Sequence, residues 1–315
     1  MKVLVTGAGG FVGYAVAALL VERGHDVLGL TRTSSSRLPD GVQRARGDIS
    51  NSAALVAATD GVDGVCHLAA RTRVRESRSD PLGYWHTNVT GTLTLLQAMG
   101  ETGTARLVLA STCGVYGDQA AQPIDESAPP TPTNPYGTSK LAADYAAMDL
   151  AGTGAIGAIS LRAFNIAGAL PGHPDRDDTR LIPRIVAVQR GTAPELVVNG
   201  DGDAIRDFVH VADMAEAFAL ALDACEPGTT RTYNIGSGRA TRVRDVIEVA
   251  EQVTGRWVAR RHAPAAAEPQ ELLADSRAIQ TDLGWNPRRS GMEEILTDAW
   301  TAAAEVHSPT EYSRS

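Results

Sequence analysis

The chain has 315 residues, of which 43% are hydrophobic and 21% charged, and its net charge is −8 with a pI near 5.4. These values are ordinary for a globular protein, and the negative charge argues against nucleic acid as a partner. No apolar run approaches the ~18 residues of a membrane span, and the three cysteines show neither paired nor metal-ligand spacing, so we expect a cytoplasmic protein without a membrane anchor or a metal site.

Strands and helices alternate from the first residue to about residue 165. The predicted strands in this part are Lys2–Thr6, Asp26–Leu30, Val62–Ala69, Arg106–Ala110 and Ala158–Arg162. The predicted helices are Gly13–Arg23, Ala53–Thr59, Leu82–Met99 and Tyr136–Leu150. This β-α-β-α order predicts an α/β fold with a doubly wound parallel sheet of the Rossmann type.

The alternation loosens after Asn165. Residues 169–179 hold two prolines, one glycine and four charged residues, and we predict a loop there. Further helices are predicted over Ile182–Gln189, Val211–Asp223, Val243–Thr254 and Gly291–Val306. We therefore expect a cofactor domain over 1–165, to which 205–235 returns, a smaller α/β substrate-binding lobe over 166–204 and 236–307, and a flexible tail over 308–315.

The first predicted strand runs into a glycine-rich turn that opens a helix. Glycines at this point let the backbone turn tightly and approach a pyrophosphate, which the helix N-terminus attracts. A turn that serves structure alone is a poorer explanation of this pattern at this place. The predicted cofactor contacts in the turn are Gly7, Gly10, Phe11, Val12 and Gly13.

The acid that usually follows the second strand of such a fold is missing, and Thr31-Arg32 stands in its place. An acid would bind the ribose hydroxyls of NAD, whereas Arg32 can accept a 2′-phosphate or stack on adenine. The residues therefore leave the choice between NAD and NADP open. Asp48 is placed to contact the adenine, although an ordinary loop aspartate explains its position equally well.

Tyr136 and Lys140 form a Tyr-x-x-x-Lys pair on a predicted helix. Residues four apart lie on one helix face, so a phenol and an ammonium can stand side by side. A nearby positive charge lowers the pKa of a tyrosine from its usual value of about 10. An isolated pair is more often a surface tyrosine and a solvated lysine, but Thr112 adds a hydroxyl at a strand end, and the three residues together predict acid/base chemistry beside a nicotinamide.

Two neighbours of these residues are predicted to be structural. His67 belongs to a turn that contacts the cofactor and is expected to hold that turn in place. Cys113 follows Thr112 and is expected to pack, because no histidine lies nearby in the sequence to activate it as a nucleophile.

Taken together, these motifs resemble those of the extended short-chain dehydrogenase/reductases, and among them the UDP-sugar 4-epimerases. The resemblance covers nearly the whole chain. The matching segments are Thr6–Gly13, His67–Ala70, Asn88–Thr92, Ser111–Gly117, Thr131–Lys140, Phe164–Asn165, Arg206–Val211 and Tyr233–Gly236.

The resemblance implies a reaction and a cofactor. NAD is expected to stay bound and to take and return a hydride at C4 of the sugar. Tyr136 would remove the C4 hydroxyl proton, Lys140 would lower the tyrosine pKa and hold the nicotinamide ribose, and Thr112 would hydrogen-bond the C4 oxygen.

The resemblance also implies further contacts. Those to the cofactor are Arg32, Asp48, Ile49, Leu68, Ala69, Ala70 and Asn88. Those to the UDP-sugar are Thr72, Thr112, Asn165, Arg180, Arg206 and Glu268. Relatives are usually homodimers through the helices predicted at Leu82–Met99 and Tyr136–Leu150, so we expect a homodimer here.

Two departures from the epimerase pattern bear on the sugar. Ala163 replaces a tyrosine and Arg180 replaces an asparagine, both near C6 of the sugar in relatives. This change favours a C6 carboxylate, so we expect epimerisation of UDP-glucuronate to UDP-galacturonate, with UDP-glucose and UDP-galactose as the alternative pair. It is equally open that Arg180 points to solvent from a helix start.

Other enzyme classes and a binding protein are less favoured. Related dehydratases and decarboxylases need an acid after the catalytic threonine, and here Cys113-Gly114 follow Thr112. A non-catalytic NAD(P)-binding sensor would have no need of Tyr136, Lys140 and Thr112 together.

Overall fold

The centre of the fold is a seven-stranded sheet in the order β13-β6-β5-β4-β1-β2-β3. Every neighbouring pair in it is parallel. The strands are β1 (Lys2–Thr6), β2 (Asp26–Thr31), β3 (Gln43–Arg46), β4 (Gly64–His67), β5 (Arg106–Thr112), β6 (Gly157–Ala163) and β13 (Thr230–Ile235). The computed structural model describes residues 1–265 and 268–307, so the predicted tail over 308–315 lies outside the described residues. The prediction of a doubly wound parallel sheet is confirmed.

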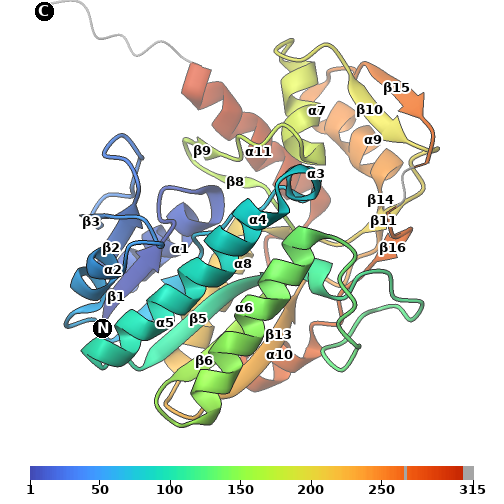
Figure 1. Cartoon of the computed structure of the whole chain (residues 1–315). Coiled ribbons are helices and arrows are strands. Elements are labelled where there is room, and N and C mark those ends of the chain that lie inside the picture. The colour runs from blue at the N-terminus through green and yellow to red at the C-terminus, as the bar shows by residue number, and fades with distance from the viewer. Residues whose placement is uncertain (266–267, 308–315) are drawn as a thin grey trace, which may run out of the picture.

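The two faces of the sheet bury separate cores because side chains alternate along each strand. Val3 and Val5 of β1 face one core, and Leu4 between them faces the other. The first core lies under α1 (Phe11–Glu22) and α8 (Val211–Ala224). The second lies under α2 (Ser52–Thr59), α5 (Gly91–Thr102) and α6 (Pro135–Gly152). Figure 1 shows α5 and α6 running side by side in front of the sheet.

The helix predicted over Leu82–Met99 is not continuous. The structure has α3 (Val74–Ser79), α4 (Pro81–Tyr84), a π-helical turn over Trp85–Thr90 and then α5. Asp80 caps α4 by accepting a hydrogen bond from the backbone of Gly83. Because π turns add a residue to a helix and are frequent near functional sites, this irregular stretch marks the helix that borders the site.

A smaller lobe lies beside the carboxyl end of the sheet and has a core of its own. Its helices are α7 (Leu181–Gln189), α9 (Val243–Thr254) and α11 (Met292–His307). Its strands pair as β10 (Leu196–Asn199) with β15 (Arg260–Ala263), and as β11 (Ile205–Arg206) with β14 (Thr241–Arg242) and β16 (Glu271–Leu272). Figure 1 shows α7, α9, β10 and β15 grouped together, away from the main sheet.

The chain crosses back to the sheet between the two parts of this lobe. β12 (Phe208–His210) pairs with β7 (Asn165–Ala167), α8 then packs on α1, and β13 becomes the edge strand of the main sheet beside β6. The assignment of domain limits at 165, 205 and 235 stays a prediction.

Several elements were absent from the predictions, among them the edge strand β13, the strands of the small lobe and the short elements that follow. β3 is an exposed edge strand with the sequence Gln-Arg-Ala-Arg, which lacks the apolar alternation of a buried strand. The predicted loop over 169–179 contains a hairpin of β8 (Ala169–Leu170) and β9 (His173–Pro174). A short helix, α10, spans Arg277–Leu283. None of the described helices combines the length and the hydropathy that crossing a bilayer requires.

Candidate active site

Tyr136 and Lys140 lie in the first two turns of α6, at the carboxyl edge of the sheet. Pro135 occupies the first turn of this helix, and the Asn134 side chain caps it by accepting a hydrogen bond of 2.9 Å from the backbone of Gly137. Thr112 ends β5, the adjacent strand, and its hydroxyl hydrogen-bonds the Tyr136 phenol. The structure thus brings together the three residues predicted to be catalytic.

The pKa of Tyr136 differs from the expectation. Burial raises it to about 12, and the Thr112 hydrogen bond and the charge of Arg180 oppose this rise. Lys140 was expected to be the cation that lowers the pKa, but the strongest cationic influence comes from Arg180. Burial also lowers the pKa of Lys140 itself to about 8, although Asp144 opposes this. In the protein alone, the phenol is therefore protonated at neutral pH.

Lys140 is buried with 4% of its surface exposed, and among the described residues its ammonium makes no hydrogen bond and no ion pair. Asp144, one turn further along α6, is instead held by the hydroxyls of Ser111 at 2.8 Å and Ser160 at 2.9 Å, with Arg162 at 3.3 Å. A buried cation without a protein partner is costly, so this ammonium suits the hydroxyl oxygens of a bound ribose.

The glycine turn is packed so tightly that side chains are excluded. Gly7 has a φ of +71°, and a Cβ there would lie 2.9 Å from the backbone nitrogen of Ala69. A Cβ on Gly13 would lie 2.2 Å from the carbonyl oxygen of Gly7. Such a cradle at the N-terminus of α1 fits a pyrophosphate, so together with Lys140 the residues present fit a nicotinamide dinucleotide.

A buried chain of hydrogen bonds fixes the floor of this cradle. The Thr6 hydroxyl accepts hydrogen bonds from the backbone of Leu68 and Ala69, both at 3.1 Å, and donates to Nδ1 of His67 at 2.7 Å. Nε2 of His67 then donates to Thr92 at 3.1 Å. Burial, with a smaller influence of Lys140, lowers the pKa of His67 to about 3, so the ring stays neutral. These contacts agree with the structural role predicted for His67, and they hold the predicted contact residues Leu68, Ala69 and Ala70 beside the glycine turn.

The residues predicted at the adenine end lie close to one another. One oxygen of Asp48 accepts hydrogen bonds from the backbone and the hydroxyl of Ser50, at 2.9 and 2.8 Å, which lower the pKa of Asp48. Arg32 is exposed and within electrostatic reach of Asp48, and Ile49 packs where Gly91 lets α5 approach. Asp48 therefore makes the local bonds of a loop aspartate, and its adenine contact stays a prediction.

Asn88 is occupied within the protein. Its amide oxygen accepts a hydrogen bond of 2.8 Å from the backbone N–H of Arg71. Its amide nitrogen donates to the carbonyl of Arg71 at 3.0 Å and to the hydroxyl of Ser139 at 2.9 Å. Ser139 in turn donates to the carbonyl of Tyr136 at 2.8 Å. The side chain of Asn88 is thus a positioning group for α6, and its predicted contact with the cofactor stays a prediction.

Of the two arginines predicted to bind the UDP-sugar, Arg206 is the more buried. Its guanidinium lies 3.6 Å from Glu268, its side chain is largely buried, and that burial lowers its pKa. It also lies within electrostatic reach of Cys113, next to Thr112. Asn165 faces the same edge and donates to the carbonyl of Asp207 at 3.0 Å. Thr72, also predicted here, is exposed just before α3.

Arg180 does not point freely into solvent. It precedes α7, and Nη1 lies 3.1 Å from Asp175 while Nε lies 3.8 Å from Asp177. Asp177 also meets Arg73, which precedes α3, with 3.3 Å between Nε of Arg73 and the carboxylate. Asp175, Asp177 and Arg73 were absent from the predicted site. The signal for the two acids was the dense charge of residues 175–178, in a segment predicted to be a loop, whereas no motif indicated Arg73.

Tyr84 is a further residue that no motif indicated. It is fully buried, and its ring meets that of Tyr136 edge to face, with 6.3 Å between centroids. Its hydroxyl donates to the carbonyl of Arg73 at 2.7 Å and accepts from the backbone of Arg73 at 2.9 Å. Tyr84 therefore connects the phenol of Tyr136 to the segment that carries Arg73.

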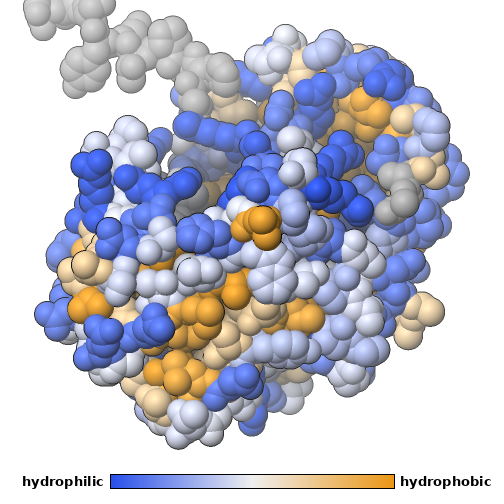
Figure 2. All heavy atoms as spheres, in the orientation of Figure 1, coloured by the Kyte–Doolittle hydropathy of each residue, from blue (hydrophilic) through white to orange (hydrophobic). Residues whose placement is uncertain are grey.

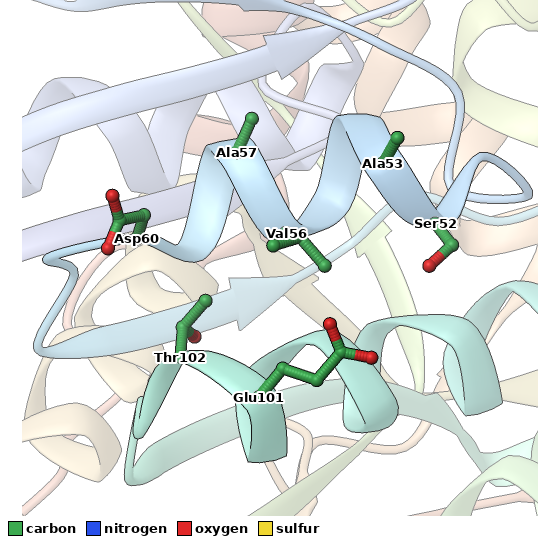
Figure 3. A pocket seen from close by; sticks show the side chains of 7 residues that line it. All are labelled: Ser52, Ala53, Val56, Ala57, Asp60, Glu101 and Thr102. Carbon is green, nitrogen blue, oxygen red and sulfur yellow. The ribbon is translucent and has the colours of Figure 1, made fainter.

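A separate hollow lies between α2 and α5. Figure 3 shows Ser52 and Val56 of α2 facing Glu101 and Thr102 of α5 across it. None of the residues predicted to bind cofactor or substrate lines this hollow, so it is distinct from the site at the carboxyl edge of the sheet.

Comparison with known proteins gives concordant results. Residues 3–236 match the NAD dependent epimerase/dehydratase family. The chain is 39% identical over 312 residues to a UDP-glucose 4-epimerase of Corynebacterium glutamicum, with 95% of each chain covered.

Two sets of solved structures share the fold. The UDP-glucose-4-epimerase of Stenotrophomonas maltophila, with bound NAD and formylated UDP-arabinopyranose, has a TM-score of 0.90 at 31% identity and covers 96% of this chain and 98% of its own. MoeE5, solved with UDP-glucose and NAD and also with UDP-glucuronic acid and NAD, has a TM-score of 0.87 at 32% identity and covers 96% and 99%.

Proposed function

The chain belongs to the NAD-dependent epimerase/dehydratase family, and on this premise we propose that it interconverts UDP-glucose and UDP-galactose at C4. The observation that carries the proposal is the contact between the Tyr136 phenol and Thr112, one helical turn from the buried, unpartnered ammonium of Lys140. This is the arrangement that reversible oxidation of a secondary alcohol requires.

The family resemblance inferred from the motifs is confirmed, and so are the enzyme class and the cofactor. The chain is an NAD-dependent UDP-sugar 4-epimerase, which is an isomerase. NAD, when bound, supplies the hydride acceptor.

In the proposed mechanism, Tyr136 takes the proton of the C4 hydroxyl as hydride leaves C4. It later returns that proton to the C4 oxygen when hydride comes back to the opposite face of the 4-keto sugar. Thr112 donates to the phenol oxygen, so its hydroxyl can pass the proton between the phenol and the C4 oxygen. Because burial keeps the phenol protonated in the protein alone, positive charge is needed to generate the base, and Arg180 and Lys140 are the cations proposed to supply it. Lys140 would also hold the ribose hydroxyls of the cofactor.

The UDP part of the substrate is assigned to the small lobe. Arg206 is proposed to bind the diphosphate together with Asn165, since a guanidinium can donate two parallel hydrogen bonds to phosphate oxygens. Glu268 is proposed to accept from the uridine ribose, and Thr72 to border the sugar. The 3.6 Å pair of Arg206 with Glu268 supports a shared role for these two residues.

Elimination and decarboxylation are less favoured by the site. Where an acid would be needed, Cys113 follows Thr112, and burial raises the pKa of its thiol to about 12. A thiol that stays protonated cannot serve as a base near neutral pH. Simple epimerisation needs no group at this position.

We expected UDP-glucuronate to be the main substrate, and we now propose a neutral UDP-sugar in its place. Arg180 was the residue expected to bind a C6 carboxylate, but Asp175 and Asp177 already lie on its guanidinium. The Corynebacterium glutamicum relative is a UDP-glucose 4-epimerase, which agrees with a neutral sugar. UDP-glucuronate stays as a second candidate, because Arg180 lies within electrostatic reach of Tyr136 and MoeE5 has been solved with UDP-glucuronic acid.

The test is to incubate the purified protein separately with UDP-glucose and UDP-glucuronate, without added cofactor, and to follow the C4 epimers by NMR. Conversion of UDP-glucose well above UDP-glucuronate is expected. Preferential conversion of UDP-glucuronate would select the second candidate, and no conversion of either sugar, even with added NAD, would refute both.

A homodimer is also proposed. Several large apolar side chains are exposed on α4, the π-helical turn, α5 and α6, namely Leu82, Trp85, Leu93 and Tyr145. Figure 2 shows apolar residues gathered on the face that α5 and α6 present. Apolar surface on neighbouring helices is typical of an interface. Light scattering is expected to give twice the chain mass, and replacement of Leu82 and Leu93 by Glu is expected to give the single-chain mass.

A further inference from the structure

We propose that Asp175 and Asp177 are specificity-determining residues that make the sugar site select neutral UDP-sugars over acidic ones, by occupying Arg180. This inference rests on the proposed function, because it assumes that the site binds the sugar with C4 at Tyr136. It assigns the discrimination to two carboxylates and not to the arginine alone.

Each carboxylate has one oxygen tied to the local chain and the other directed at Arg180. One oxygen of Asp175 accepts from the backbone of Asp177 at 3.0 Å, and the other meets Nη1 of Arg180 at 3.1 Å. One oxygen of Asp177 accepts from the backbone and hydroxyl of Thr179 at 3.2 and 2.6 Å, and the other lies 3.8 Å from Nε of Arg180. The two acids are therefore held by the loop in the positions that neutralise the arginine.

Asp177 is held from both sides of the site. Its second oxygen also lies 3.3 Å from Nε of Arg73. The Tyr84 hydroxyl holds the backbone of Arg73, because it accepts a hydrogen bond from the Arg73 N–H and donates one to the Arg73 carbonyl. Tyr84 packs edge to face on Tyr136. The chain of contacts thus runs from the phenol to Arg180 and places the two acids beside the sugar.

Burial separates these acids from an ordinary surface pair. The Asp175 side chain is 8% exposed and that of Asp177 15%, whereas Asp178, which pairs with Arg184 at 3.6 Å, is 63% exposed. Water screens these two carboxylates less than that of Asp178, so a like charge brought beside them is repelled more than it would be at the surface.

Position and charge then decide the specificity. C6 lies two bonds from C4 in the sugar, so a group on C6 comes close to the cation that acts on Tyr136. A C6 hydroxymethyl can hydrogen-bond to this cluster without cost, but a C6 carboxylate would meet two carboxylates already paired with Arg180. Building like charge against one ligand is an established way to reject it.

The experiment compares the wild type with Asp177→Asn, Asp175→Asn and the matched control Asp178→Asn. Calorimetry measures the Kd of UDP-glucuronate and of UDP-glucose for each protein, and NMR measures kcat/KM for both sugars. We expect the wild type to bind UDP-glucose more tightly. Asp177→Asn and Asp175→Asn should each shift the Kd ratio toward UDP-glucuronate by about tenfold, which corresponds to about 1.4 kcal/mol of relieved repulsion. Asp178→Asn should leave the ratio unchanged.

A double variant built on Asp177, which is less buried than Asp175, keeps the test informative if Asp175→Asn misfolds. Adding Arg180→Gln to Asp177→Asn should abolish the gain in UDP-glucuronate binding, because the released arginine is its source. An unchanged Kd ratio in both aspartate variants would overturn the inference while leaving UDP-glucose epimerisation intact. Equal wild-type affinity for both sugars would overturn it as well. Absence of turnover with either sugar would refute the proposed function, and the Kd ratios would still decide the inference.

Discussion

The cofactor side and the sugar side of the site are held by different forces. On the cofactor side, Tyr136, Lys140 and the glycine turn are fixed by helix caps and by buried hydrogen bonds such as those of Asn88 and His67. On the sugar side, Arg180 and Arg206 are held by ion pairs to acids on loops. Buried hydrogen bonds are costly to lose, whereas partly exposed ion pairs contribute little to stability. Substitutions on the cofactor side should therefore cost more stability than substitutions on the sugar side, so the substrate preference can change more easily than the reaction.

Removing the phenol is expected to have the largest effect. Tyr136→Phe should lower kcat by about 10³, because a positioned acid/base group contributes 10²–10⁴ to the rate. UDP affinity should stay within about twofold, since the ring and the helix remain. Tyr145→Phe is the control, because Tyr145 lies on the same helix and is 53% exposed. Comparable losses in both variants would contradict a catalytic role for Tyr136.

A side chain in the glycine turn should affect both stability and cofactor content. Gly13→Ala places a Cβ 2.2 Å from the carbonyl oxygen of Gly7, so we expect the free energy of unfolding to fall by about 1–3 kcal/mol and the purified protein to carry less NAD. Gly100→Ala is the control, because its Cβ meets no atom within 4 Å. Chemical denaturation and the absorbance of released NAD measure the two quantities. Full NAD content in Gly13→Ala would show that the turn is not a cofactor cradle.

A change on the sugar side should alter binding more than turnover. Arg206→Lys keeps the charge but loses the paired hydrogen bonds of a guanidinium, so we expect KM to rise about tenfold with kcat nearly unchanged. Arg242→Lys, on the strand paired with that of Arg206 and 49% exposed, is the control. If kcat fell and KM did not rise, Arg206 would belong with the catalytic group.

The smallest expected effect is a pH dependence of stability from His67. Its pKa is about 3 in the folded protein, against a usual value of 6.5, so below pH 6.5 the unfolded chain binds a proton that the folded protein does not. Stability should therefore fall as the pH falls. Between pH 7.5 and 6, the free energy of unfolding should drop by about 0.8 kcal/mol more in the wild type than in His67→Gln, as measured by urea denaturation. Equal slopes would show that folding does not lower the pKa of His67.

The sequence predicted the parts of the site that regular structure positions. Tyr136 and Lys140 are four residues apart on a helix, and the glycines follow a strand, so spacing alone placed them. Tyr84 and Arg73 could not be found in this way, because their contact with the site depends on an irregular π-helical stretch and on packing between segments far apart in the chain.

The pairing of charged groups and the pKa of Tyr136 were harder to predict than the positions of the residues. Arg180 was placed beside the sugar from the family pattern, but its partners Asp175 and Asp177 lie in a segment with no periodic pattern. The pKa of Tyr136 likewise depends on how deeply the ring is buried, which no local spacing encodes. The same limit explains β3, whose polar edge position hides it from any search for apolar alternation.

The return of α8 and β13 to the main sheet bears on how the protein can be divided for engineering. A fragment cut after Asn165 would contain the glycine turn, Thr112 and Lys140, but it would lack the helix that covers α1 and the strand that pairs with β6. Val5 and Val16, both fully buried in the core that α8 covers, would then face water. A cofactor module cannot be excised from this chain as one continuous piece. A fragment library or a fusion design should retain 208–235 and treat the intervening 168–207 as the insertion.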